Sequence, residues 1–120
     1  MKNFLAIYIG TAAALERAEW NKLDDATRKA RQASGVKAWM DWGAANAAAI
    51  VDQGTPLGRT KRASPEGVTD IKNVMTGYVV VRAESHDAAA KLFENHPHFT
   101  IFPGDSVEIM ECLPLPDQGQ

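Results

Sequence analysis

The feature that most constrains this fold is a pair of strand-like segments that are apolar on both faces. Alternate apolar side chains of residues 3–10 point to opposite sides, Leu5, Ile7 and Ile9 to one and Phe4, Ala6 and Tyr8 to the other. Residues 78–83 form a second such segment around Val79–Val81. A strand that is apolar on both faces lies inside a sheet with protein packed on each side.

Helix signals follow the first strand. Thr11 is placed to cap a short helix over residues 12–20. Residues 21–25 interrupt the helical pattern, Asp24 or Asp25 offers the next N-cap, and residues 34–35 mark another break or kink. The main helix is predicted over residues 36–52, ended by Gly54 and Pro56. Its buried face is predicted from spacings of three and four and comprises Val36, Met40, Gly43, Ala47 and Ile50, flanked by Trp39 and Trp42.

The second half of the chain reads as a hairpin, a strand, a helix and a closing strand. Ser64–Gly67 has the residues of a tight turn, which predicts a polar hairpin over residues 57–75. A helix capped by Ser85 follows the valine-rich strand, and Pro97 is predicted to end it. Residues 106–113 are predicted to form the last strand, and residues 114–120 a frayed tail.

This order of elements predicts one α+β domain over residues 1–120. It is the ferredoxin-like split βαβ plan, an antiparallel sheet with its helices on one face. That plan leaves the other sheet face uncovered, although both inner strands are apolar there. Because a large exposed apolar patch marks a contact surface, we expect a homodimer formed through this open sheet face.

Composition excludes several classes of protein. The net charge of −2 over 120 residues argues against nucleic-acid binding, and no apolar run is long enough to span a membrane. The N-terminal apolar run matches a strand better than a secretory signal. The single cysteine, Cys112, excludes an internal disulfide, is expected to be a small buried residue, and fits a cytoplasmic protein.

Several segments together resemble the YCII-related (DGPF-type) family. They are MKNFLAIYIG, AWMDWGAANAAAIVDQGTPLG, TGYVVVRAESHDAAAKLFENHP and GDSVEIMECLP, roughly residues 2–113. The resemblance implies the dimeric α+β barrel fold, in which two ferredoxin-like subunits join their sheets. It also implies a His–Asp pair in some members, but the matching helix region Lys37–Trp42 has no His, and His96 replaces the Asp before Pro97.

His96 and His98 are the candidate catalytic residues. Two imidazoles around Pro97 can converge on one cavity, and a histidine can act as general acid or base near neutral pH. The competing interpretation is that both histidines only hydrogen-bond locally or face solvent. A metal site would need a third ligand such as Asp105, Glu108 or Glu111, which no spacing places, so no metal is predicted.

Aromatic residues could line an apolar pocket between sheet and helices. The predicted pocket residues are Tyr8, Trp39, Asp41, Trp42, Tyr78 and Phe99. No glycine-rich phosphate loop or nucleophile elbow is present, and no cofactor is predicted. The basic residues of the hairpin fit either a solvated edge or an anion site. The leading hypothesis is a protein that binds a small organic molecule, as an isomerase or lyase using histidine or as a non-catalytic module.

Overall fold

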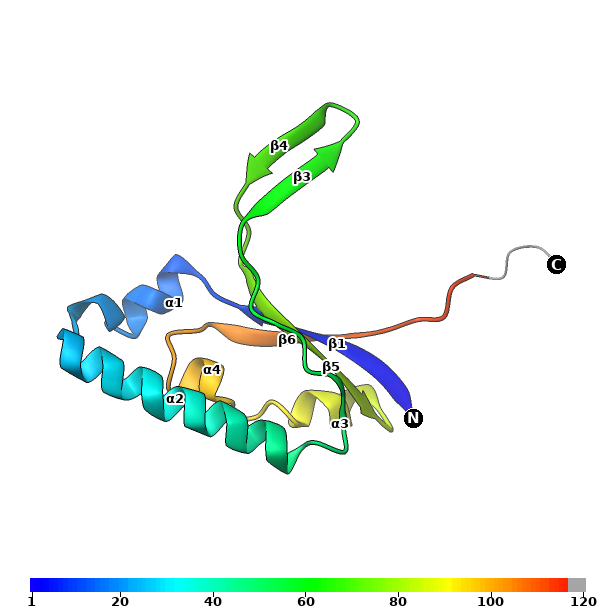
Figure 1. The fold of residues 1–120 in the computed structure, drawn as a ribbon. Coiled ribbons are helices and arrows are strands. Elements are labelled where there is room, and N and C mark those ends of the chain that lie inside the picture. The colour runs from blue at the N-terminus through cyan, green and yellow to red at the C-terminus, as the bar shows by residue number, and fades with distance from the viewer. Residues whose placement is uncertain (117–120) are drawn as a thin grey trace.

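Four strands form one antiparallel sheet at the centre of the computed structural model, which describes residues 1–116 (Figure 1). They are β1 (Lys2–Ile9), β2 (Ile50–Asp52), β5 (Met75–Ala83) and β6 (Ser106–Glu111), in the order β2-β5-β1-β6. Each neighbouring pair is antiparallel. This order confirms the predicted ferredoxin-like split βαβ plan, with the two apolar strands β1 and β5 in the middle.

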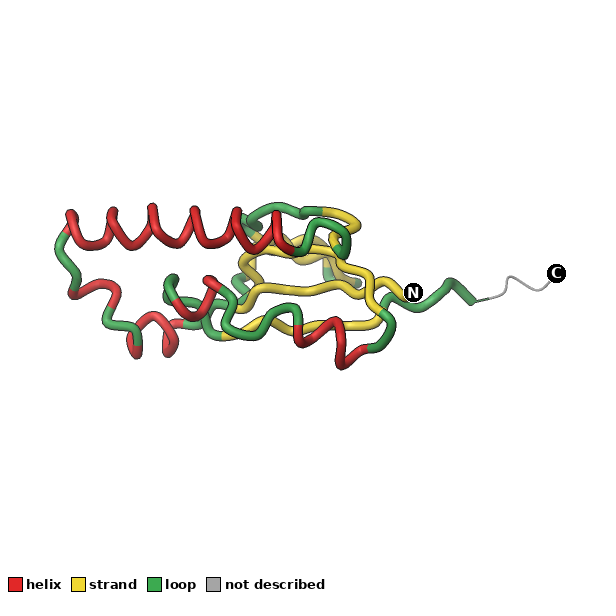
Figure 2. Tube along the Cα trace, turned by 90° about the horizontal axis from the view of Figure 1, so that it is seen from below, coloured by secondary structure: helices red, strands yellow, loops and turns green. Residues whose placement is uncertain are grey.

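The core lies between the sheet and the helices that lie along one of its faces (Figures 1 and 2). Phe4 pairs with Val81 and Ala6 with Val79 across β1 and β5, so these four side chains share one face. All four are buried, and Ala89 and Phe93 pack against them from the helix side. The predicted alternation along β1 is therefore correct, and it places Tyr8 on the face that the helices cover.

Two of the shorter helices begin directly after the residues that were predicted to cap them. Helix α1 (Ala12–Arg17) begins after Thr11, whose hydroxyl accepts from the Ala14 amide, and a 3₁₀ turn, η1 (Trp20–Lys22), follows it. Ser85 caps α3 (His86–Lys91) in the same way. The structure adds α4 (Pro97–Thr100), because Pro97 takes the first helical position instead of only ending the preceding helix.

The main helix differs from the prediction in its bounds. Helix α2 runs without a break over Asp25–Ala45, capped by Asp24, and it ends before the predicted residue Asp52. Gly35 does not interrupt it. It is buried against the ring of Phe102, where a side chain at residue 35 would overlap that ring. The glycine therefore allows close approach within a continuous helix.

The buried face of α2 is also not the predicted one. Val36 and Met40 are exposed, Met40 by 70%, whereas the half-buried Trp39 and Trp42 pack on the core. Two large indole rings bury more apolar area than a valine and a methionine, and this outweighs the regular spacing of the smaller residues. The exposed stripe remains on the outer side of the helix.

The hairpin forms where it was predicted, but it does not belong to the main sheet. Strands β3 (Thr60–Ser64) and β4 (Gly67–Ile71) pair only with each other, around a turn at Pro65–Glu66. The fourth strand of the main sheet is instead β2, which lies in residues predicted to be helical. Residues 50–52 form a strand because their pairing with β5 outweighs their local preference for helix.

The sheet face opposite the helices carries no helix of the described chain (Figure 1). The register of β1, β5 and β6 places Leu5, Ile7, Ile9, Tyr78, Val80, Glu108 and Met110 on this open face. Strand β6 ends at Glu111, so Cys112 lies beyond it and is exposed, contrary to the burial predicted for it. Residues 114–116 are exposed and form no helix or strand, and residues 117–120 lie outside the described residues. Within residues 1–116, no helix is both long enough and apolar enough to cross a membrane.

Candidate functional site

The two candidate histidines lie in and just before the short helix α4. His96 is its N-cap residue, and its Nδ1 atom accepts a hydrogen bond of 3.0 Å from the backbone amide of His98. Both side chains are buried, His96 with 0% and His98 with 6% of its surface exposed. The two histidines therefore belong to a capped turn of helix, and their side chains are buried in the protein.

Aromatic rings surround the His96 imidazole. Trp39 and Trp42 lie 4.5 and 4.7 Å from it between ring centroids, and Tyr8 and Phe93 lie 5.2 and 5.8 Å away. Burial, with a smaller contribution from the nearby His98, lowers the pKa of His96 from 6.5 to about 4. His96 is therefore neutral at neutral pH.

The hydrogen bonds of His96 define its tautomer. A backbone amide only donates, so the Nδ1 atom that it meets carries no proton, and neutral His96 holds its proton on Nε2. That Nε2 atom lies 3.4 Å from the Tyr8 hydroxyl oxygen and donates toward it. Burial raises the pKa of the Tyr8 hydroxyl, which therefore keeps its proton.

His98 fastens helix α4 to the end of β1. Its Nε2 atom donates to the Ile9 carbonyl oxygen over 2.7 Å, and the Asp105 amide donates to the same oxygen over 2.9 Å. Gly104 packs so closely on the imidazole that a side chain at residue 104 would overlap it. Burial lowers the pKa of His98, while its bond to Ile9 opposes that shift. Both histidines thus make hydrogen bonds that hold the backbone in place.

A cleft opens beside Tyr8 at the edge of the sheet near β2. It has a volume of about 240 Å³ and is lined by Tyr8, Trp39, Gln53, Gly54, Thr55, Pro56, Thr76, Gly77 and Tyr78. Gly54 has a positive φ of 65° and lies against the Tyr78 carbonyl, where any side chain would overlap it. Neither histidine lines this cleft. Tyr8 does line it, and its hydroxyl meets His96.

The structure brings together only part of the predicted site. Tyr8, Trp39 and Tyr78 line the cleft, whereas Trp42 packs in the core and donates from Nε1 to the Leu92 carbonyl over 2.8 Å. Asp41 faces solvent and pairs with Lys37 at 3.0 Å, because the helix turns it away from the tryptophan face.

Phe99 is half-exposed and lines a separate hollow between α3, α4 and β6. Residues 53–56 also line the cleft, but they were not predicted as pocket residues because the main helix was expected to end directly before them. Gly54 and Pro56 were read there only as signals that end the helix. In residues 1–116, no three His, Cys, Asp or Glu side chains are grouped so that they could hold a metal ion.

One solved structure has a similar fold. It is the 5-chloro-2-hydroxyhydroquinone dehydrochlorinase of Burkholderia phenoliruptrix AC1100, determined in complex with 2,5-dihydroxybenzoquinone. The two chains are 16% identical, the match covers 89% of each, and the TM-score is 0.51. At this identity the likeness shows the fold alone, that of the dimeric α+β barrel class. No protein-family model matches the sequence, and no curated protein does.

Proposed function

We propose that this protein binds a small, flat organic molecule in the cleft beside Tyr8. The observation that supports this most directly is a cleft of about 240 Å³ with two aromatic side chains of the core, Tyr8 and Trp39, in its wall. Binding sites for small molecules are mostly apolar with a few polar groups, and this volume suits a compound with one ring. The structural neighbour was solved with a one-ring quinone, which supports the same class of ligand.

Tyr8 is the polar group that we expect to meet the ligand. Its hydroxyl keeps its proton, receives a hydrogen bond from His96 at 3.4 Å, and can donate to an oxygen of the ligand. In a reaction of the isomerase or lyase type, Tyr8 would give its proton to an oxygen of the ligand, and the Nε2–H of His96 would stabilise the Tyr8 oxygen until the proton returns, while His98 holds α4 in place. The alternative is binding without catalysis, which requires the Tyr8 hydroxyl only as a hydrogen-bond donor.

Titration calorimetry with 2,5-dihydroxybenzoquinone, and with a panel of hydroquinones and benzoates, tests the proposal. We expect Tyr8→Phe to weaken binding of a compound that the wild-type protein binds by about tenfold, since one hydrogen bond to the ligand is lost. Trp20→Phe is the matched aromatic control, because Trp20 lies outside the cleft. Equal affinities of Tyr8→Phe and wild-type protein for every bound compound would contradict the proposal. If the His96→Asn variant turns over a bound compound as fast as the wild-type protein, His96 takes no part in catalysis and only the binding proposal stands.

We also propose that the protein is a homodimer joined through its open sheet face, as expected of a YCII-related protein. Most side chains on this face are apolar: Met110 is exposed and Leu5 and Val80 are half-buried, whereas Ile7 and Ile9 are already buried within the subunit. Two such faces packed together would complete the barrel and remove the patch from water. The resemblance of the sequence segments to the YCII-related family supports the same assembly.

Met110→Lys tests this interface, because Met110 is 44% exposed and its replacement leaves the subunit core intact. We expect the variant to sediment as a monomer at concentrations where the wild-type protein is a dimer. Met40→Lys, on the outer side of α2, is the control and should remain dimeric. A dimer that tolerates Met110→Lys would be formed by a different surface.

A further inference from the structure

The ribbon of β3 and β4 stands away from the rest of the molecule (Figure 1). Apart from the half-buried Thr60 and Ser64, every residue of its two strands is exposed. A two-stranded hairpin without a packed face is at best marginally stable in water. The ribbon is joined to the sheet only through residues 53–59 and 72–74, which we call the stalk. Packing against another surface would stabilise a ribbon of this kind.

Several apolar side chains on the ribbon and its stalk are exposed to solvent. Val68 is 68% exposed, and Leu57, Ile71, Val74 and Met75 are also exposed. These residues lie on the two segments that continue into β5 and toward β2. Val68 and Ile71 are three positions apart in β4, so they project from opposite faces of the ribbon. Strand β5, which follows the ribbon in the chain, is one of the two inner strands of the open sheet face.

The ribbon and the residues next to it have a net charge opposite in sign to that of the rest of the chain. Residues 59–72, which we call the arm, contain four basic residues and two acidic ones. Since the arm therefore carries +2 and the whole chain carries −2, the remaining residues carry −4. A basic arm and an acidic body attract each other between two copies of the same protein.

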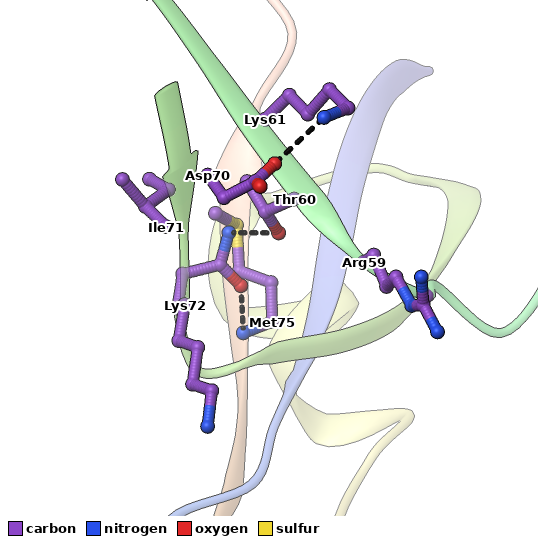
Figure 3. A pocket seen from close by; sticks show the side chains of 9 residues that line it. Arg59, Thr60, Lys61, Asp70, Ile71, Lys72 and Met75 are labelled. Carbon is purple, nitrogen blue, oxygen red and sulfur yellow. Dashed lines mark hydrogen bonds and ion pairs between the residues drawn. The ribbon is translucent and has the colours of Figure 1, made fainter.

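The geometry of the arm favours a broad contact over a site for one small anion. A hollow of about 660 Å³ lies at its base, lined in part by Arg59, Lys61, Asp70 and Lys72. Figure 3 shows Lys61 turned toward Asp70, at 2.7 Å, whereas Arg59 and Lys72 point away from each other. The basic groups thus do not converge on one point, as a bound phosphate or carboxylate would require.

The stalk of the arm is held in place by side-chain hydrogen bonds. Asn73 donates from Nδ2 to the Thr60 hydroxyl oxygen over 3.0 Å, and its Oδ1 atom accepts from the Met75 amide over 2.9 Å. This bracing links both strands of the ribbon to the start of β5. An arm with a defined direction loses less conformational freedom when it binds a partner.

We propose that the arm packs against the acidic body of a second copy of this chain. This inference rests on the homodimer proposed above and adds a second contact to it, so that each subunit places its arm on its partner. The contact combines burial of Val68 and neighbouring apolar side chains with attraction between the basic arm and acidic groups of the partner. Its electrostatic part weakens as salt is added.

Sedimentation equilibrium of charge variants tests the proposal. Arg62→Glu with Lys72→Glu reverses two exposed charges of the arm, and Lys29→Glu with Lys91→Glu makes the same change in net charge on the body. We expect the arm variant to raise the dimer dissociation constant about tenfold or more at about 50 mM salt, and less at about 500 mM. The body variant should stay close to wild type. Val68→Ser, at an exposed position, should also weaken the dimer at both salt concentrations.

The outcomes separate the arm from the sheet interface. If Met110→Lys is monomeric while the arm variant and Val68→Ser dimerise like wild type, the arm proposal is wrong and the sheet dimer stands. If the body variant weakens the dimer as much as the arm variant does, the effect is one of net charge and the arm proposal is again wrong. A wild-type protein that is monomeric at every concentration overturns both proposals.

Discussion

His96 couples the stability of the core to pH. Its imidazole caps α4 through Nδ1, meets Tyr8 through Nε2 and is enclosed by aromatic rings, so the fold accepts the neutral form. In the unfolded chain the same group ionises near 6.5, whereas in the folded protein its pKa falls to about 4. The unfolded state therefore binds more protons between these two values, and the free energy of unfolding falls as the pH is lowered through this range.

We predict a loss of roughly 3 kcal/mol in the free energy of unfolding from His96 alone between neutral pH and pH 4. His96→Asn keeps a side-chain acceptor at the N-cap but cannot ionise, so its stability should change less over this range. Urea denaturation at several pH values measures the slopes. If the free energy of unfolding changed equally with pH in wild type and in His96→Asn, this account would be wrong.

Sequence alone identified His96 and His98 as the distinctive polar pair and predicted that they open into a cavity beside Tyr8 or the tryptophans, whereas neither histidine lines the cleft. It did not show that their ring nitrogens bond to the His98 amide and the Ile9 carbonyl. Ile9 is separated from His98 by 89 positions in the chain. Such a contact depends on how α4 packs against β1, which no local pattern of residues contains.

At the level of elements, α2 shows the limit of helical periodicity. The helix is rich in alanine, so several faces are apolar enough to be buried, and the regular series with Val36 and Met40 was the natural choice. In the structure the tryptophan face packs on the sheet, and Trp42 also donates to the Leu92 carbonyl. Ring area and one long-range hydrogen bond decide the rotation of the helix about its axis.

This arrangement predicts a large loss of stability for substitution of Trp42 and almost none for Met40, although the two residues are two positions apart. Trp42→Ala should lower the free energy of unfolding by about 3 kcal/mol, because it leaves a cavity beside Phe93 and an unpaired Leu92 carbonyl. Met40→Ala should change it by less than about 0.5 kcal/mol in the isolated subunit, because its side chain already faces solvent. Urea denaturation monitored by circular dichroism measures both. A large loss for Met40→Ala would instead favour the face that the periodicity indicated.

For the whole molecule, the homodimer that we propose through the open sheet face would make stability depend on association. Folded subunits associate and unfolded chains do not, so the unfolding temperature of a dimer rises with protein concentration. We predict that a hundredfold increase in concentration raises the midpoint of thermal unfolding by roughly 2–6 °C, and that Met110→Lys removes this dependence. Scanning calorimetry at several concentrations measures it. A midpoint that is independent of concentration over the whole range would mean that the subunit is stable alone.

The sequence by itself determined the class of fold. Strands apolar on both faces, caps at Thr11 and Ser85, and the hairpin turn after Ser64 are local signals, and each of them predicted an element that the structure contains. Only the tertiary structure decided the position of β2, the rotation of α2 and the lining of the cleft. These features depend on pairing and packing between residues far apart in the chain, where the energy of long-range contacts exceeds weak local preferences.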